Sequence, residues 1–250
     1  MAWDPDLGDQ PDPSWRHEAP DVLSPINADA PVSGHHPPSR AMGGPSQAPE
    51  HDWLAAEAVL FPVIRPGGTS GTRLDEIDAA RLAAEGMKSH GAPILEGGPC
   101  GLAVGYVLRA DSFDIHVNAD HLLAWGASPV ELRAAAMANL ARWSAATPWT
   151  EEVSGLRRLL SSASGDGDDA ARILLPEVRA HITATLGPEV RVLVGIPERD
   201  LLVAGTLSEG DEEFAALFAE FIRGHADDSD QPLDRRVLEL VGGELRLFEG

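Results

Sequence analysis

Two runs of alternating apolar and polar residues predict a pair of strands near the middle of the chain. The alternation spans residues 102–108 and returns at 113–117. A period of two is typical of strands that bury one face. We expect the two runs to form a hairpin, which sets Leu108 near Phe113 and Tyr106 near Ile115.

Further strands are predicted on both sides of this hairpin. A β-branched run at 59–65 contains Pro62, which suits an edge strand because proline has no backbone donor. Apolar runs at 190–196 and 201–207 flank a turn sequence. Near the end of the chain, Gly242-Gly243 predicts a tight hairpin that pairs Leu240 with Leu245, Leu238 with Leu247 and Glu239 with Arg246.

Capping residues mark the helices. Asn118 is placed to cap a helix over 119–125 that ends at Gly126. Ser128-Pro129-Val130-Glu131 then has the order of a capping box, with proline at the first helical position. The helix that follows carries one stripe formed by Leu132, Ala136, Asn139, Leu140 and Trp143. The clearest helical spacing in the chain is that of Phe214, Leu217, Phe218, Phe221 and Ile222.

Three other segments are less regular. Thr72 is placed to cap a short helix over 74–85. Residues 150–164 fit neither the helical nor the strand period well. Asp168 or Asp169 can cap a later helix, which Pro176 should kink or restart.

The composition divides the chain at about residue 50. Residues 1–50 hold ten of the 20 prolines, a density that stops helices and ladders from propagating. We therefore expect a disordered, proline-rich acidic tail over 1–50 and one domain over 51–250. The predicted fold class is α+β, with a mostly antiparallel sheet covered by helices on one face.

Charge narrows the classes of partner. The chain has 40 acidic and 19 basic residues, a net charge of -21 and a pI near 4.6. This disfavours nucleic acid and anionic membranes as partners and favours a basic protein. With one cysteine, Cys100, neither an intrachain disulfide nor a multi-cysteine zinc site can form. Neither a signal peptide nor an apolar run of membrane-spanning length is evident, so we expect a cytoplasmic protein.

Six segments in order resemble one family. They are Pro62-Val63-Ile64-Arg65, Gly105-Tyr106-Val107-Leu108, Ala138-Asn139-Leu140, Asp169-Ala170-Ala171-Arg172-Ile173-Leu174, Ile196-Pro197 with Asp200-Leu201-Leu202, and the Gly242-Gly243 hairpin. Together they resemble the YtpQ-type family over about residues 59–249. The resemblance implies a mixed α/β bacterial cytosolic protein of unassigned function, and it implies a strand within 153–163. Longer members carry an N-terminal strand and helix where this chain has its tail.

Five residues are candidates for a binding site. Arg65 and Arg172 can grip an anion, or they can form internal ion pairs with Asp169 or Asp200. Asn139 lies among apolar neighbours on its helix, where it either contacts a ligand or is a buried amide bonded to backbone.

Other chemistry-bearing residues have simpler explanations. Cys100 is a candidate nucleophile beside His116 or His121, or a small apolar residue at a strand start. The two histidines lack a third zinc ligand nearby. The 67–72 loop has no phosphate-binding lysine, and 166–169 lacks a calcium loop's later ligands, so we expect a connector and a helix cap. No metal or cofactor is predicted.

The functional prediction is a non-enzymatic binding or adaptor module for a basic protein partner. One alternative is a hydrolase-type enzyme that uses scattered carboxylates and His116. Another is a toxin-neutralising, immunity-like protein, since such inhibitors are often acidic. No catalytic Gly-x-Ser-x-Gly or dinucleotide-binding fingerprint is present in the sequence.

Overall fold

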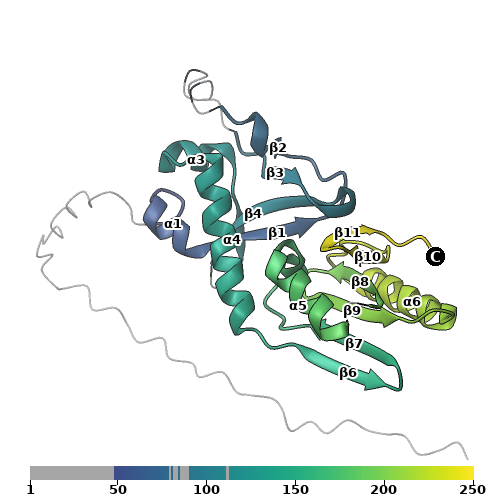
Figure 1. Ribbon diagram of the computed structural model, residues 1–250. Helices are drawn as coiled ribbons and strands as arrows, with labels where there is room; N and C mark the ends of the chain where they lie inside the picture. The colour runs from purple at the N-terminus through teal and green to yellow at the C-terminus, as the bar shows by residue number, and fades with distance from the viewer. Residues whose placement is uncertain (1–47, 79, 81–83, 85–89, 111–112, 188) are drawn as a thin grey trace, which may run out of the picture. The chain divides into compact units, whose positions relative to one another are not determined.

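The computed structural model describes residues 48–78, 80, 84, 90–110, 113–187 and 189–250, all within one compact unit (Figure 1). The predicted tail lies outside these residues except for 48–50, which form a turn. The turn leads into helix α1 (Trp53–Val59), whose first turn is capped by Asp52. Helix α1 was not expected from the spacing of apolar residues, because it is only seven residues long.

The first sheet has the strand order β1-β4-β3-β2, and β5 also pairs with β4. Its strands are β1 (Leu60–Arg65), β2 (Thr72–Arg73), β3 (Ile94–Gly97), β4 (Ala103–Arg109) and β5 (Asp114–His116). Strand β1 lies at an edge, as its proline predicted. The pairing is antiparallel except between β2 and β3.

Two expectations for this sheet are wrong. The hairpin exists, but Leu108 pairs with Ile115 instead of Phe113, because the connection is two residues longer than predicted. Phe113 is 63% exposed. Thr72 does not cap a helix: it lies in β2, and a 3-10 turn, η1 (Leu74–Glu76), follows without a side-chain cap. Residues 79, 81–83 and 85 of the expected helix lie outside the described residues.

The capping signals predicted the next two helices correctly. Helix α3 (Ala119–Trp125) has Asn118 as its N-cap and ends at Gly126 in the left-handed conformation. Helix α4 (Pro129–Ala146) begins with the Ser128–Glu131 capping box. Figure 1 shows α4 running from the first sheet towards a second sheet. Its buried stripe contacts the cores on both sheets, since Leu132 packs in one and Leu140 in the other.

The second sheet is antiparallel, with the order β11-β10-β8-β9-β7-β6. Its strands are β6 (Thr150–Ser154), β7 (Arg157–Ser162), β8 (Arg191–Glu198), β9 (Leu201–Leu207), β10 (Leu238–Val241) and β11 (Glu244–Leu247). The Gly242-Gly243 hairpin has the predicted register. The ambiguous 150–164 segment is a β-hairpin.

Helices cover both faces of this second sheet. A 3-10 segment, η3 (Ala170–Leu174), leads into α5 (Pro176–Leu186), where Pro176 restarts the helix at its first position. Helix α6 (Glu212–Asp228) packs on the opposite face. The alternation along β8 shows this, because Val192 and Val194 belong to the core with α5 and Leu193 to the core with α6.

The fold class is therefore α+β, as predicted, but the strands form two sheets and helices cover more than one face. Pairing of β7 with β9 holds the 150–162 hairpin in the second sheet. Among the described residues, we find no helix with the length and hydropathy of a transmembrane segment.

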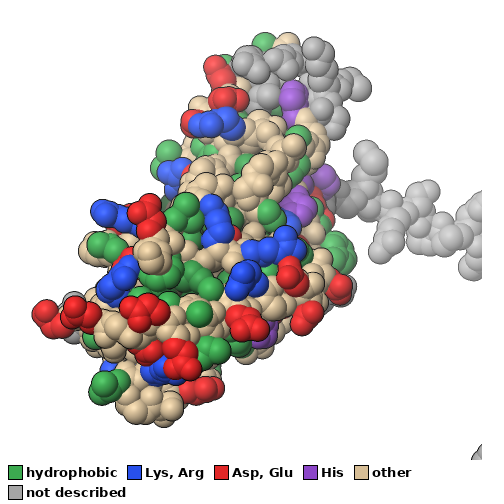
Figure 2. Space-filling model, turned by 90° about the vertical axis from the view of Figure 1, so that its right-hand side faces the viewer, with side chains coloured by type: hydrophobic (Ala, Val, Ile, Leu, Met, Phe, Trp, Pro, Cys, Tyr) green, Lys and Arg blue, Asp and Glu red, His purple; other side chains and the backbone are tan. Residues whose placement is uncertain are grey.

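Charged side chains cover the surface in both signs. On the face drawn in Figure 2, arginines gather at middle height and most carboxylates lie below them. Several pairs join different elements, such as Arg157 with Asp211 at 2.7 Å and Arg191 with Glu239 at 2.7 Å. Because acidic residues outnumber basic ones by 40 to 19, pairing leaves a large excess of negative charge.

Candidate binding cleft

A polar cleft of about 1350 Å³ lies where the two sheets meet. One wall is the face of the first sheet that the helices leave uncovered. The other side is formed by the 165–167 loop, the turn between β8 and β9, and the loop that follows α6. Its charged lining consists of Arg65, Arg109, Asp114, His116, Asp166, Glu198, Arg199, Asp200, Asp228 and Asp230. This site joins segments that are far apart in the sequence.

The hairpin of β4 and β5 supplies much of the first wall. Arg109 pairs with Asp114 and Val107 with His116 across the hairpin. Paired residues of adjacent strands share a face, and alternate residues face the other way. Tyr106 and Leu108 therefore enter the helix-covered core, and the charged side chains face the cleft.

Arg65 and His116 contact each other on this wall. Nη2 of Arg65 lies 2.7 Å from Nε2 of His116. Because a guanidinium only donates, Nε2 must accept, which defines a neutral imidazole protonated on Nδ1. Burial, followed by repulsion from Arg65, lowers the pKa of His116. The pKa of Arg65 is lowered by burial and then by repulsion from Arg199.

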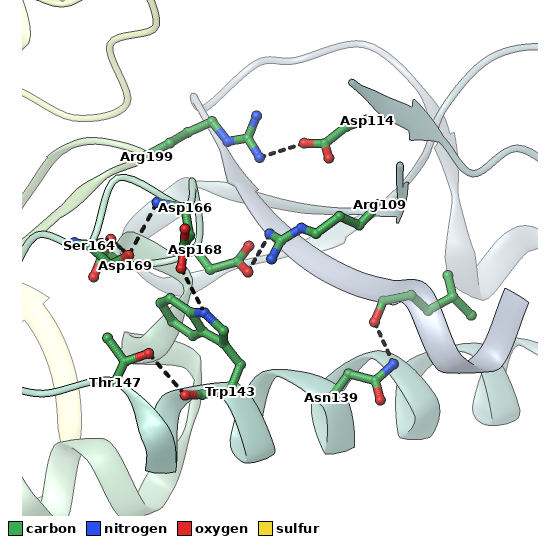
Figure 3. Close-up of polar contacts among 11 residues, drawn as sticks. Arg109, Asp114, Asn139, Trp143, Thr147, Ser164, Asp166, Asp168, Asp169 and Arg199 are labelled. Atoms are coloured by element: carbon green, nitrogen blue, oxygen red, sulfur yellow. Dashed lines mark hydrogen bonds and ion pairs between the residues drawn. The ribbon is translucent and has the colours of Figure 1, made fainter. Parts of the chain in front are cut away.

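Figure 3 shows two Arg–Asp ion pairs of this region, Arg199 with Asp114 and Arg109 with Asp168. Nη2 of Arg199 lies 2.7 Å from Oδ2 of Asp114. Arg109 forms an ion pair with Asp168, and its guanidinium stacks over Phe61 at 4.2 Å from the ring centroid. Asp168 is completely buried, and burial raises its pKa to about 6 although Arg109 opposes the shift. Two of the three arginines thus have their charge neutralised by an aspartate.

The opposite side of the cleft is acidic. Asp166 accepts a hydrogen bond from Nε1 of Trp143 at 3.2 Å, and Glu198 lies 3.6 Å from the His225 ring. Within the described part of the chain, three further carboxylates of the lining make neither a hydrogen bond nor an ion pair. They are Asp200, Asp228 and Asp230, which we call the rim carboxylates.

The structure brings together only two of the five predicted site residues. Arg65 and Asp200 both line the cleft, but they form no ion pair with each other. Asn139, Asp169 and Arg172 do not line it.

Asn139 is buried, and its amide is bonded to backbone. Its Nδ2 donates to the carbonyl oxygens of Glu57 at 2.7 Å and Leu60 at 2.8 Å. These carbonyls lie at the C-terminal end of α1, so the side chain caps that helix. The structure therefore supports the buried-amide interpretation over the ligand contact.

Arg172 belongs to a buried network instead of an anion site. It is 1% exposed and donates to Oγ of Ser144, to Oγ of Ser162 and to the carbonyl oxygens of Ser144 and Thr147. Its guanidinium also stacks over Trp149 at 4.0 Å. The expected direct pair with Asp169 is replaced by a bridge, because Ser162 bonds to both residues.

Asp169 does not cap the helix that was expected to follow it. Asp169 precedes η3 but has helical backbone angles and makes no side-chain cap bond. It accepts hydrogen bonds from Ser162 and Ser164 instead. Asp168, the other predicted cap, is held by Arg109.

The remaining candidates do not assemble into a reactive centre within the described residues. Cys100 is half-buried in a left-handed backbone conformation, and burial raises the pKa of its thiol. His121 completes the capping box of α3 and stacks on Trp125. The 67–72 loop joins β1 to β2, so a helix does not follow it as in a phosphate-binding loop. The described residues hold no cluster of three or more His, Cys, Asp or Glu suited to a metal.

Sequence reasoning missed six charged residues of the lining, and it also missed Asp168, which pairs with one of them. The six are Arg109, Asp114, Glu198, Arg199, Asp228 and Asp230. One signal for two of them was present, since the correct hairpin register places Arg109 opposite Asp114. Asp168 and Arg199 come from loops of the second sheet, and only the tertiary structure places them beside the first.

The function of this protein has to be inferred from the geometry of the cleft, because comparisons with known proteins assign none. The resemblance to the YtpQ-type family stays a prediction. Models of known protein families, curated protein sequences and solved structures give no match to this chain.

Proposed function

We propose that this protein is a non-enzymatic binding protein whose polar cleft receives a cationic segment of a basic protein partner. The observation that carries the proposal is the set of rim carboxylates, Asp200, Asp228 and Asp230, which line a cleft of about 1350 Å³ without an ion-pair partner among the described residues. Carboxylates that converge on a cleft focus a negative potential there and attract cationic groups.

The arginines of the lining do not cancel this charge, because only Arg65 lacks a carboxylate partner among the described residues, against three rim carboxylates. Asp114 neutralises Arg199, and Asp168 neutralises Arg109. The rim therefore keeps its charge for a ligand, in a chain whose net charge is already -21. Steering of this kind mainly raises the association rate and weakens with salt.

The proposal includes a cytoplasmic location, which the single cysteine favours over a disulfide-forming compartment. A basic toxin is one partner of the required chemistry, so neutralisation of a toxin is a special case of the same binding function.

The test is titration of the full chain with a hexa-arginine peptide by calorimetry. The cleft variant combines Asp200→Asn, Asp228→Asn and Asp230→Asn. The matched control combines Glu209→Gln, Glu244→Gln and Glu249→Gln, which removes the same charge from exposed positions outside the cleft. We expect the cleft variant to bind about tenfold more weakly and the control to change affinity by less than about twofold. Equal losses would show that only net charge matters and would reject the cleft.

The contact between Arg65 and His116 favours a second candidate function, a hydrolase for an anionic substrate. A substrate carboxylate or phosphate that binds Arg65 would release Nε2 of His116, which is 2.7 Å away. The neutral imidazole could then take a proton from water as a general base.

This second candidate predicts turnover of nitrophenyl esters or phosphate esters that is lost in His116→Ala. Absence of turnover by the wild-type chain excludes it for these substrate classes. Activity that persists in His116→Ala excludes the assigned role of the histidine.

A further inference from the structure

A second, apolar groove of about 390 Å³ lies between α6 and the outer strands of the second sheet. It is separate from the polar cleft, and its lining residues are different. Its apolar walls include Val153, Leu159, Phe214, Leu217, Phe218 and Phe221.

Three of these side chains are exposed to solvent. Val153 is 63% exposed, Leu217 51% and Phe221 44%. Leu217 and Phe221 are four residues apart on α6 and therefore lie on one face of the helix. Single exposed apolar residues are common on protein surfaces, but a contiguous apolar groove between charged residues is typical of an interaction site.

Strand β6 borders the groove, and none of the described strands pairs with its outer edge. It is the last strand in the order β11-β10-β8-β9-β7-β6, and all five of its residues are exposed. The backbone donors and acceptors on the outer side of an edge strand can pair with an added strand.

Charge around the groove selects the kind of strand that can be added. The carboxylate of Glu152 in β6 makes no ion pair or hydrogen bond within the described residues. Glu220, one turn from Leu217, is exposed and makes no ion pair within the described residues, whereas the exposed Glu213 already pairs at 2.9 Å with Arg157, which also lines the groove. A second copy of β6 in the fully overlapping antiparallel register would set Glu152 against Glu152, and like charges directly opposite are destabilising.

We propose that β6 and the apolar groove of α6 form a docking surface for an extended segment of another protein in which apolar residues alternate with lysine or arginine. The backbone of the segment would extend the sheet at β6. Its apolar residues would cover Leu217 and Phe221, and its basic residues would meet Glu152 and Glu220. This surface does not depend on the cleft, so failure of the cleft experiment leaves it untouched.

The test is fluorescence anisotropy of labelled ten-residue peptides titrated with the full chain. The probe alternates valine and lysine. One control peptide has the same composition in two blocks, which keeps the charge and removes the alternation. A second control alternates valine and glutamate, which keeps the alternation and reverses the charge.

Variants of the protein locate the binding surface. Leu217→Ala and Phe221→Ala remove apolar contacts, and Glu152→Lys reverses the charge on the exposed strand. Leu156→Ala is the matched control, because Leu156 is 83% exposed in the β6–β7 turn but does not line the groove.

We expect the alternating basic peptide to bind at least tenfold more tightly than either control peptide. Each of the three surface variants should weaken binding by at least fivefold, and Leu156→Ala should leave it within twofold of the wild-type value. Equal binding of the block peptide, or an unchanged affinity in Glu152→Lys and Phe221→Ala, would overturn the proposal. Dimerisation in sedimentation that these variants abolish would also overturn it, because the occupant would then be a second copy.

Discussion

At the residue scale, the side chain of Asn139 joins α4 to the end of α1. Its amide nitrogen satisfies two carbonyl groups at the end of α1, and its oxygen accepts from Arg142 at 3.1 Å. Helix α1 ends at Leu60 in an extended conformation, so these carbonyls depend on a side chain. The burial of Asn139 in an apolar stripe is thus explained, because its side chain caps the end of a neighbouring helix.

Asn139→Ala should therefore destabilise the protein by about 1–3 kcal/mol, because it leaves buried carbonyls without donors. Chemical denaturation measures the loss. Arg142→Ala is the control, since it removes only the bond to the amide oxygen from an exposed side chain, and we expect a cost within about 0.5 kcal/mol. Equal costs for the two variants would argue against the capping role.

Asp168 gives the protein a pH dependence of its own. Burial raises its pKa to about 6, whereas an unfolded aspartate titrates near 3.9. The folded state therefore binds the extra proton between about pH 4 and pH 6, and this group's contribution to stability falls as the pH rises through that window. Asp168→Asn should lack this dependence.

The free energies of unfolding of the wild type and Asp168→Asn, measured at pH 4, 5, 6 and 7, test this directly. Relative to the variant, the wild type should lose about 2 kcal/mol between pH 4 and pH 7, with most of the change below pH 6. A wild type that gains stability over the variant in this range would contradict the assignment.

At the scale of elements, helix ends could be predicted from local capping residues, whereas the pairing of strands distant in the sequence could not. Helix α3 begins and ends where Asn118 and Gly126 predicted, and α4 begins where Ser128 predicted, because a cap acts within its own helical turn. The hairpin register of β4 and β5 was wrong by two residues, since the alternation is compatible with more than one loop length. Division of the strands into two sheets depends on contacts such as β7 with β9.

The candidate site was harder to predict than the fold for the same reason. An ion pair of Arg65 with Asp169 or Asp200 was one interpretation of the sequence, but neither the sequence around Arg65 and Asp200 nor its periodicity indicates that these two line one cleft without pairing. The ion pair of Arg109 with Asp168 joins residues 59 positions apart.

The packing of α6 against β8 predicts opposite changes in stability for two glycine-to-alanine substitutions. A Cβ on Gly195 would overlap the side chain of Ile222, lying 2.7 Å from its Cγ1, and Ile222 is fully buried. Gly195→Ala should cost about 1–3 kcal/mol because α6 must shift. Gly224→Ala, in the same helix with open space around it, should instead stabilise by about 0.5–1 kcal/mol through helix propensity. Thermal and denaturant melts give both values, and equal signs would refute the packing argument.

At the scale of the whole molecule, two sheets share α4 and leave a polar cleft on the side that the helices do not cover. The first sheet presents arginines, and the loops of the second present carboxylates. Both proposed surfaces, the cleft and the α6 groove, carry unpaired acidic residues. Under the two proposals, a basic partner would be bound at these specific places, beyond the general attraction of the net charge.

The N-terminal limit of the stable fold is the last prediction. Ten prolines in the first 50 residues predict that removal of 1–47 changes the melting temperature by less than about 2 °C. Removal of 1–52 should lower it by about 4–8 °C. That truncation deletes the Asp52 cap of α1, which accepts from Leu54, and the Pro49 carbonyl, which lies 2.8 Å from Nε1 of Trp125. Each contact contributes about 1 kcal/mol, and in a domain of this size 1 kcal/mol corresponds to about 2–4 °C. Calorimetric scans of the two truncated chains measure the difference, and equal melting temperatures would show that the turn at 48–52 does not stabilise α1.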